Sequence, residues 1–270
     1  MPEPHLHLLT LAVGNTRTRV GLFHGRDLND PVSILNSDFA AIAKRVDELL
    51  ENERDVPIVI ASVNNPIADR IETLMKERAG EDVYRIGRDL GIPMKHALDD
   101  ESTVGHDRLL NCLGAYSRAK QACIVIDAGT AITVDFVDGE GTFQGGVIAP
   151  GLNLMLKALH DNTAALPQIA FEMPDMKRGP FGKDTKHAMR LGVLNAARGV
   201  ARMMIDLYAD HYGAYPQIVA TGGDAAALFS DDPVVEHIVS DLQLIGIREA
   251  ATKVLGEESE TDIELLDGDD

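Results

Sequence analysis

Two stretches of this chain share one order of residue types: Leu9-Thr10-Leu11-Ala12-Val13-Gly14-Asn15-Thr16 and Val125-Ile126-Asp127-Ala128-Gly129-Thr130-Ala131. Each reads as an apolar strand that turns at a glycine beside hydroxyl-bearing residues. Glycine lets a backbone approach an oxyanion, and neutral side chains next to it can donate hydrogen bonds. The pattern indicates two phosphate-binding turns, although either glycine alone could equally well just close a hairpin. Asp127 lies two positions before its glycine and can hold a cation, whereas Ala12 occupies that position in the first turn.

The predicted elements around the two turns repeat. Alternating and continuous apolar runs predict strands over 6–13, 17–23, 31–35 and 56–62, and helices over 39–52 and 66–78. After a helix over 104–120, the order begins again with strands over 122–127, 131–138 and 142–149, a helix over 184–212 and a strand over 217–220. We therefore predict a duplicated α/β fold with lobes at 1–118 and 119–256, followed by an acidic, disordered tail at 257–270.

Composition narrows the class of protein. The 270 residues carry 43 acidic and 25 basic side chains, a net charge of −18, which argues against nucleic acid or an anionic membrane as the main partner. No apolar run has membrane-spanning length, and the first residues lack the pattern of a secretory signal, so we expect a cytoplasmic protein. The two cysteines, Cys112 and Cys123, lack zinc-site spacing and are expected to be buried.

Three further segments could carry chemistry: Val104-Gly105-His106-Asp107-Arg108, Gly145-Gly146-Val147-Ile148-Ala149-Pro150-Gly151, and the loop bounded by 163–167 and 182–185. The first places a carboxylate beside a guanidinium at a predicted helix start. An acidic side chain there also interacts favourably with the helix dipole. The second is a tight connection from a strand to a helix. The third is rich in proline, methionine and charge, which is typical of binding loops. Each signal is weak when taken singly.

Taken in order, these motifs together with Gly14-Asn15-Thr16, Asp127-Ala128-Gly129-Thr130-Ala131, Gly182-Lys183-Asp184-Thr185 and Thr221-Gly222-Gly223-Asp224 closely resemble those of type III pantothenate kinases. The resemblance spans about residues 8–225. That family belongs to the actin, hexokinase and Hsp70-like ATPase superfamily. The resemblance implies two duplicated ribonuclease-H-like (actin-like ATPase) lobes, each a mixed β-sheet with flanking helices.

The resemblance also implies an activity, which is ATP-dependent phosphorylation of pantothenate to 4'-phosphopantothenate, the first step of coenzyme A biosynthesis. Asp107 matches the general base that takes a proton from the substrate hydroxyl. Gly105, His106 and Arg108 match the segment that holds the substrate, and a guanidinium suits its carboxylate. Thr185 matches a threonine that contacts the substrate.

Cofactor and partner assignments follow from the same resemblance. Residues that match the phosphate-binding turns are Gly14, Asn15, Thr16, Arg17, Thr18 and Thr130. Asp127 matches a ligand of a monovalent cation, commonly potassium or ammonium, and magnesium should accompany ATP. The family is typically a homodimer, which makes the helical region after Asp184 the candidate contact surface.

Four positions depart from the family pattern. Ala12 replaces an acidic residue that helps to hold metal-bound phosphates, and alanine cannot coordinate a metal. Leu98 replaces a common tyrosine, His106 a usual alanine, and Asp184 a frequent asparagine. Two alternatives therefore remain beside an active kinase. One is a non-catalytic relative that binds a ligand and acts as a regulator, and the other is a kinase for another small hydroxy acid.

Overall fold

The computed structural model of this protein describes residues 7–79 and 82–266. The chain divides into two compact units, which we describe separately. The first comprises Met1–Lys95, Asp100–Arg118 and Asp241–Asp270, and the second comprises His96–Asp99 and Ala119–Ser240. Among the described residues, no helix combines the length and the apolar character needed to cross a bilayer.

The first unit contains a five-stranded sheet in the order β3-β2-β1-β4-β5. Its strands are β1 (His7–Val13), β2 (Arg17–His24), β3 (Asp27–Leu35), β4 (Ile58–Ser62) and β5 (Val83–Arg85). Strands β1, β2 and β3 are joined by tight turns and pair antiparallel, whereas β1, β4 and β5 pair parallel because helices connect them. The turn between β1 and β2 is the first glycine turn of the sequence.

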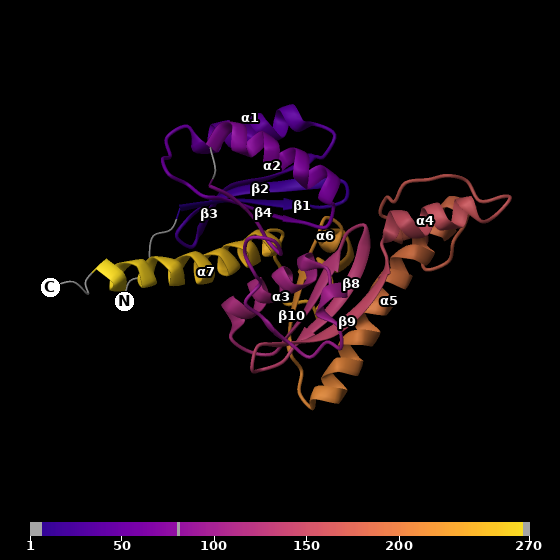
Figure 1. The fold of residues 1–270 in the computed structure, drawn as a ribbon. Helices are drawn as coiled ribbons and strands as arrows, with labels where there is room; N and C mark the ends of the chain where they lie inside the picture. Colours follow the sequence, from indigo (N-terminus) through magenta and orange to yellow (C-terminus); the bar gives the residue numbers. More distant parts are fainter. Residues whose placement is uncertain (1–6, 80–81, 267–270) are drawn as a thin grey trace. The chain divides into compact units, whose positions relative to one another are not determined.

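Helices α1 (Phe39–Leu50) and α2 (Asn65–Ala79) cover one face of this sheet, as Figure 1 shows. Asp38 starts α1 by accepting a hydrogen bond from the backbone N–H of Ala41 at 2.9 Å. The strand period of two sends alternate side chains of β1 to this face, and Leu9, Leu11 and Val13 join one buried apolar cluster with residues of both helices. Burial of this cluster fixes the register of β1.

The opposite face of the sheet is packed by α7 (Leu242–Leu266), near which α3 (His106–Ala119) also lies in the first unit. A β-carbon on Gly246 of α7 would lie 1.9 Å from the carbonyl oxygen of Leu110 in α3, so the two helices approach each other closely. Arg248, also on α7, donates from Nε to the carbonyl oxygen of Gly25, between β2 and β3, at 2.7 Å.

The compact units can be set beside the predicted lobes. The sequence analysis places the lobes at 1–118 and 119–256. In the structure, Ala119–Ser240 belong to the second unit, whereas α7 belongs to the first. The backbone of α7 also continues to Leu266, into the predicted tail of 257–270, and residues 267–270 lie outside the described part. A terminal apolar helix does not reveal by its own sequence which sheet it will cover.

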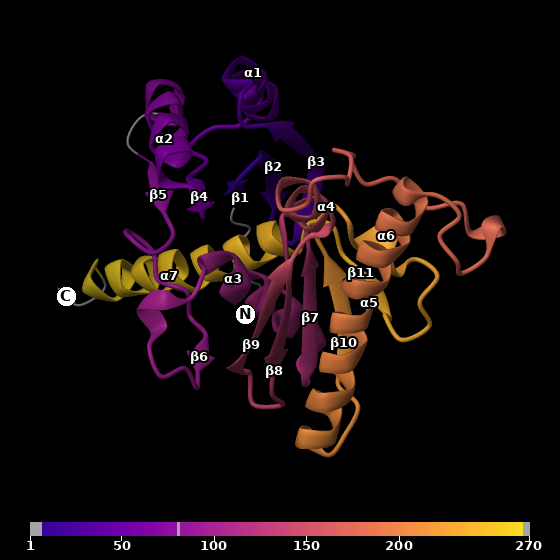
Figure 2. The ribbon, with the colours of Figure 1, turned by 90° about the vertical axis from the view of Figure 1, so that its right-hand side faces the viewer.

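The second unit contains a six-stranded sheet in the order β11-β10-β7-β8-β9-β6. Its strands are β6 (Lys95–His96), β7 (Cys123–Ala128), β8 (Ala131–Val137), β9 (Thr142–Pro150), β10 (Gln217–Thr221) and β11 (His237–Ile238). Its helices are α4 (Leu152–Asp161), α5 (Thr185–Tyr212) and α6 (Ala225–Phe229), with a short 3-10 turn at Met176–Arg178. A second 3-10 turn, at Glu101–Thr103, belongs to the first unit. The long α5, drawn in orange in Figure 2, contacts β8.

The two sheets repeat one topology. Strands β9-β8-β7-β10-β11 follow the same order and the same directions as β3-β2-β1-β4-β5, with two antiparallel pairs and then two parallel pairs. The predicted duplication of an α/β unit is therefore confirmed. Both cysteines are buried, as expected, and neither forms a disulfide; burial raises the pKa of Cys123 to about 12.

Candidate active site

The first glycine turn is held by an asparagine that the sequence does not single out. Asn36, which is buried after β3, donates from Nδ2 to the carbonyl oxygen of Gly14 at 2.8 Å and accepts at Oδ1 from the Thr18 hydroxyl at 2.8 Å. Gly14 N–H donates to the Arg17 carbonyl oxygen at 2.9 Å. Asn15, Thr16 and Arg17 are exposed, whereas Thr18 is fully buried. The exposed rim of the turn can therefore meet a ligand, while Thr18 and Asn36 shape its base.

Ala12 lies in the interior of the sheet, two residues before this turn, and is 4% exposed. Its register partners are Arg19 on β2 and Ala61 on β4. The Arg19 guanidinium donates from Nε to Oδ1 of Asp241, which precedes α7, at 2.5 Å. An ion pair beside Ala12 is thus formed by β2 and the residue that precedes α7.

The predicted base occupies the first turn of α3. Asp107 is half-buried, and its Oδ1 accepts a hydrogen bond from the backbone N–H of Arg108 at 2.9 Å. A β-carbon on Gly105 would lie 2.4 Å from the same oxygen, so the glycine leaves room for the carboxylate to fold back over the helix start. The positive end of the helix dipole stabilises a carboxylate here. The structure thus brings Gly105, Asp107 and Arg108 into one helix terminus.

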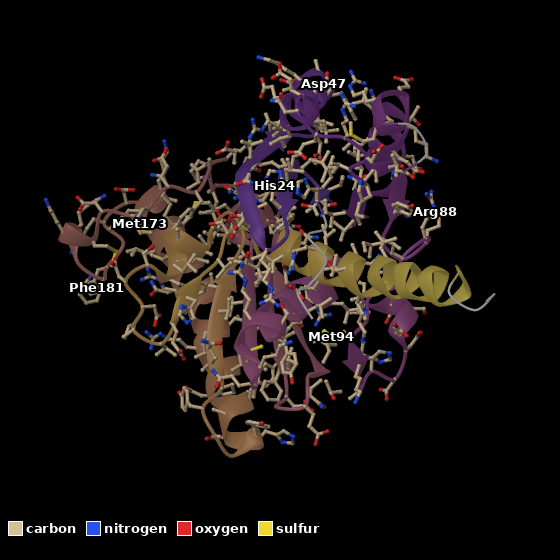
Figure 3. All side chains as sticks on the ribbon, turned by 90° about the vertical axis from the view of Figure 1, so that its left-hand side faces the viewer. His24, Asp47, Arg88, Met94, Met173 and Phe181 are labelled. Carbon is tan, nitrogen blue, oxygen red and sulfur yellow. The ribbon has the colours of Figure 1, made fainter. Side chains whose placement is uncertain are left out.

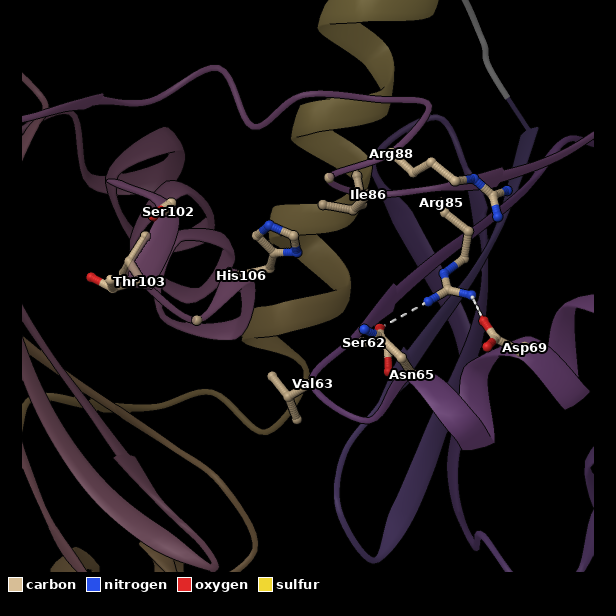
Figure 4. Close-up of a pocket in the computed structure, with 13 residues that line it drawn as sticks. Ser62, Val63, Asn65, Asp69, Arg85, Ile86, Arg88, Ser102, Thr103 and His106 are labelled. Carbon is tan, nitrogen blue, oxygen red and sulfur yellow. Dashed lines mark hydrogen bonds and ion pairs between the residues drawn. The ribbon is translucent and has the colours of Figure 1, made fainter. Parts of the chain in front are cut away.

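His106 precedes this carboxylate and lines a pocket of about 570 Å³ within the first unit, shown in Figure 4. Its ring projects between the loop before α3 and the end of β5. The ring packs against Gly87, where a β-carbon would lie 2.0 Å from Cε1 and where φ is +84°. The other lining residues come from the ends of β4 and β5, the start of α2 and the loop before α3: Ser62, Val63, Asn65, Asp69, Arg85, Ile86, Gly87, Arg88, Ser102, Thr103, Val104 and Gly105.

The two arginines of this pocket already have carboxylate partners. Arg85, which is 7% exposed, donates from Nη1 to Asp69 at 3.0 Å and to Glu72 at 3.2 Å, and Arg88 donates to Glu72 at 2.8 and 3.0 Å. Hydrogen bonds from Arg88, and also from Lys76 and Arg85, lower the pKa of Glu72 to about 2. The two arginines therefore connect β5 and the turn after it to α2. Their positive charges are balanced by the carboxylates of that helix.

The second glycine turn is built by close approaches of three backbone segments in the second unit. Asp127 is the penultimate residue of β7, and a β-carbon on Gly222 would lie 2.4 Å from its Oδ1 and 2.3 Å from the Ala128 carbonyl oxygen. A β-carbon on Gly151 would lie 2.0 Å from the Gly129 carbonyl oxygen. Thr130 is exposed at the rim of the turn. A carboxylate and several carbonyl oxygens thus gather at one strand end, which is a donor set suited to a hard cation.

A buried carboxylate in this sheet was not singled out from the sequence. Asp135 on β8 is 1% exposed, and a β-carbon on Gly146 of β9 would lie 2.3 Å from its Oδ1. Thr133, the register partner of Asp127, stands two residues before it and therefore on the same face. The signal that could have identified Asp135 is that it is the one charged residue in an otherwise largely apolar strand, 131–137.

The predicted substrate threonine, Thr185, is the first residue of α5 and is exposed. Asp184 caps the helix by accepting from the His187 backbone N–H at 2.9 Å and pairs with Arg178 at 2.9 Å. These hydrogen bonds lower the pKa of Asp184. In the same unit, Leu98 lies near Gly145, whose β-carbon would be 3.5 Å from its Cδ2.

Of the predicted site residues, the Gly14–Thr18 turn and the Gly105–Arg108 segment lie in the first unit. The Asp127–Thr130 turn and Thr185 lie in the second unit. In both units a glycine turn follows the central strand of the sheet, which is the strand-end position at which ligands of such sheets collect.

Comparison with known proteins identifies the family. A family model for type III pantothenate kinase matches residues 8–207. The type III pantothenate kinase of Akkermansia muciniphila is 32% identical over 248 residues, which cover 89% of this chain and 97% of that protein. The type III pantothenate kinase of Myxococcus xanthus is 30% identical over 254 residues, which cover 89% of this chain and 96% of that protein.

Solved structures agree on the fold. Component A of the (R)-2-hydroxyglutaryl-CoA dehydratase of Acidaminococcus fermentans matches with a TM-score of 0.53 at 15% identity, covering 92% of this chain and 97% of that one. At this identity the likeness concerns the fold alone. The duplicated glycine turns, the Asp107 segment and the family match over most of the chain lead to one conclusion: the chain belongs to the type III pantothenate kinase family.

Proposed function

We propose that this chain transfers the γ-phosphoryl group of ATP to the terminal hydroxyl of pantothenate, yielding 4'-phosphopantothenate and ADP. The observation that carries the proposal is the half-buried Asp107 carboxylate, held at the start of α3 beside Arg108 in a chain of this family. An alcohol is a weak nucleophile at neutral pH. Asp107 accepts its proton while the hydroxyl oxygen forms the bond to phosphorus and the bond to the ADP oxygen breaks.

The neighbouring residues position the substrate in this proposal. The Arg108 guanidinium binds the pantothenate carboxylate, for which a planar fork of N–H donors is suited. Gly105 and His106 form the backbone and the wall beside it, and Thr185 offers a hydroxyl from the start of α5. The arginines at the end of β5 are not assigned to the substrate because carboxylates of α2 already neutralise them.

Nucleotide binding is assigned to the two glycine turns. The exposed residues Asn15, Thr16, Arg17 and Thr130 would face phosphate oxygens, with Gly14 and Thr18 shaping the first turn. Magnesium bound with ATP would neutralise charge on the phosphates. Ala12 offers no ligand to it, so the ion is held through phosphates and water, which is common for Mg²⁺. Asp127 and the carbonyl oxygens near it fit a monovalent cation, either K⁺ or NH₄⁺.

A second candidate function follows from Ala12. A chain that binds nucleotide or a pantothenate-like ligand without turnover would act as a regulator, and the missing carboxylate favours that alternative. A kinase for another small hydroxy acid is the third candidate, because His106 and Leu98 differ from the usual residues near the substrate.

One experiment separates these functions. ADP release is measured with ATP, Mg²⁺, K⁺ or NH₄⁺, and pantothenate for the wild type and for Asp107→Asn, Ala12→Asp and the exposed control Asp99→Asn. The kinase proposal expects turnover that falls by at least about 10²-fold in Asp107→Asn and is unchanged in Asp99→Asn. Unchanged turnover in Asp107→Asn would remove Asp107 from the mechanism. An inert wild type that gains turnover in Ala12→Asp would establish the regulator instead.

We also propose a cytoplasmic homodimer, with contacts from α5. Met203 and Leu207 lie one turn apart on this helix and are 60% and 50% exposed. Phe181 and Met173, labelled in Figure 3, are 71% and 47% exposed on the loop before α5. Apolar exposure of this kind on a helix face is typical of an interface. Analytical ultracentrifugation should give a dimer for the wild type and a monomer for Met203→Glu/Leu207→Glu, and a monomeric wild type would overturn the assignment.

A further inference from the structure

A cluster of two histidines and a glutamate lies at the open end of the β1–β2 hairpin. His7 and His24 are directly paired across the two antiparallel strands, and their ring centroids are 4.4 Å apart. Glu53, which follows α1, lies against both rings: its Oε2 is 2.8 Å from Nδ1 of His7, and its Oε1 is 2.8 Å from Nε2 of His24. Strands β1 and β2 and the loop after α1 thus bring two imidazoles and one carboxylate together. Figure 3 labels His24 on its strand.

The geometry of the cluster matches what a small metal ion requires. One ligand atom from each of the three residues lies within 4.8 Å of the other two, so modest side-chain rotations bring all three to the 2.0–2.2 Å bonds of zinc. The carboxylate side chain is 17% exposed, whereas the rings of His7 and His24 are 45% and 40% exposed. The protein therefore supplies three ligands, and the exposed side of the cluster leaves room for water.

The other nitrogen of His24 has a partner that is suited to metal binding. Asn29 on β3 lies 3.0 Å from Nδ1 of His24 through its side-chain amide. A ring that coordinates a metal through Nε2 carries its proton on Nδ1 and needs an acceptor there. Rotation of the Asn29 amide by half a turn presents its oxygen to that proton. The ring can thus exchange its hydrogen bond to Glu53 for a metal bond without losing its second partner.

We propose that His7, His24 and Glu53 form a binding site for a divalent transition-metal ion of the Zn²⁺ type. Imidazole nitrogens select zinc, cobalt, nickel or copper, whereas magnesium and calcium prefer sites made of oxygen ligands alone. On binding, the proton of each neutral ring resides on the nitrogen that does not bind the metal, and the fourth position is filled by water. The site joins the start of β1 to β2 and to the end of the α1 segment.

The site is separate from the proposed kinase chemistry. His7 and His24 lie at one end of the hairpin and Gly14 lies in the turn at the other, about 20 Å away along strands that rise about 3.3 Å per residue. The ion is therefore assigned to stability of the first unit, and it does not depend on the proposed phosphorylation. Loss of the metal site should leave turnover unchanged.

The test titrates full-length, chelator-treated protein with Co²⁺, whose visible absorption reports the ligand geometry. We expect one Co²⁺ per chain, displacement by Zn²⁺, and no displacement by a large excess of Mg²⁺. His24→Gln and Glu53→Gln should each weaken binding by more than about 100-fold, and Asn29→Ala by about 10- to 100-fold as a positioning residue. Zn²⁺ at about 100 times its Kd should raise the Tm of the wild type by about 5–10 °C.

Matched controls keep the result interpretable. His211→Gln removes an exposed histidine of α5, and Glu51→Gln removes an exposed glutamate two residues from Glu53; both should bind Co²⁺ as the wild type does. His7→Gln tests the site through its most exposed ligand if circular dichroism shows Glu53→Gln to be unfolded. Absence of Co²⁺ binding, or affinity that is the same in His7→Gln and His24→Gln as in the wild type, overturns the proposal.

Discussion

The imidazole ring of His106 packs on the backbone of Gly87, leaving no space for a β-carbon at that position. The glycine also has φ of +84°, a conformation that side-chain-bearing residues rarely adopt. The turn after β5 therefore supports the residue that directly precedes the proposed base. This contact connects a backbone turn of the sheet to the start of α3, and it yields the first prediction.

Gly87→Ala should displace the His106 ring and with it the start of α3. We expect a loss of about 2–4 kcal/mol in the free energy of unfolding, from backbone strain and overpacking together, and a raised KM for pantothenate. Gly91→Ala is the matched control, because a β-carbon there meets no atom within 4 Å. Chemical denaturation and steady-state kinetics measure both effects. Equal behaviour of the two variants would contradict the role of the contact.

Gly222→Ala should disturb the proposed cation site. Its β-carbon would lie 2.4 Å from Oδ1 of Asp127, and its φ is +93°. We expect the concentration of K⁺ or NH₄⁺ needed for half-maximal turnover to rise by about tenfold or more, because the carboxylate must move by more than the tolerance of a coordination shell. The neighbouring Gly223→Ala should behave as the wild type, since nothing lies within 4 Å of its β-carbon. A cation dependence that is the same in both variants and the wild type would argue that Asp127 holds no ion.

Gly246→Ala tests the assignment of α7 to the first unit. A β-carbon there would lie 1.9 Å from the Leu110 carbonyl oxygen, so α3 and α7 would have to separate. We expect the variant to lose about 2–4 kcal/mol of stability despite the higher helix propensity of alanine. Gly192→Ala in α5 has open space around its β-carbon and should gain a few tenths to 1 kcal/mol. Urea denaturation compares them, and a stabilised Gly246→Ala would show that the two helices do not touch.

Glu72 should make stability depend on pH in the acid range. Its pKa is lowered from 4.5 to about 2, chiefly by the hydrogen bond from Arg88, so the folded state favours the charged form. The resulting stabilisation is complete above about pH 4.5 and is lost as the pH falls toward 2. A shift of this size corresponds to about 3 kcal/mol. Glu72→Gln should flatten the pH dependence of the unfolding free energy between these values, whereas the exposed Glu77→Gln on the same helix should retain it.

Much of the framework was predictable because it depends on local patterns. The continuous apolar runs of β1, β4 and β7 and the capped helix after Asp38 agree with the sequence closely, since strand and helix periods are local properties. Strands β5 and β11 were missed because three and two residues are too few to establish a period. Asn36 and Asp135 were missed for another reason, because single polar residues acquire a role only through the backbone that folds against them.

The sequence by itself determined the two glycine turns, the duplicated order of elements, the Asp107 segment and the family, because each is written in residue types a few positions apart. Only the tertiary structure decided that α7 packs in the first unit, that Gly87 supports His106, and that His7 and His24 meet Glu53. These contacts join residues far apart in the chain. Their formation depends on sheet register and on the closeness with which glycine allows two backbones to approach, neither of which a local pattern encodes.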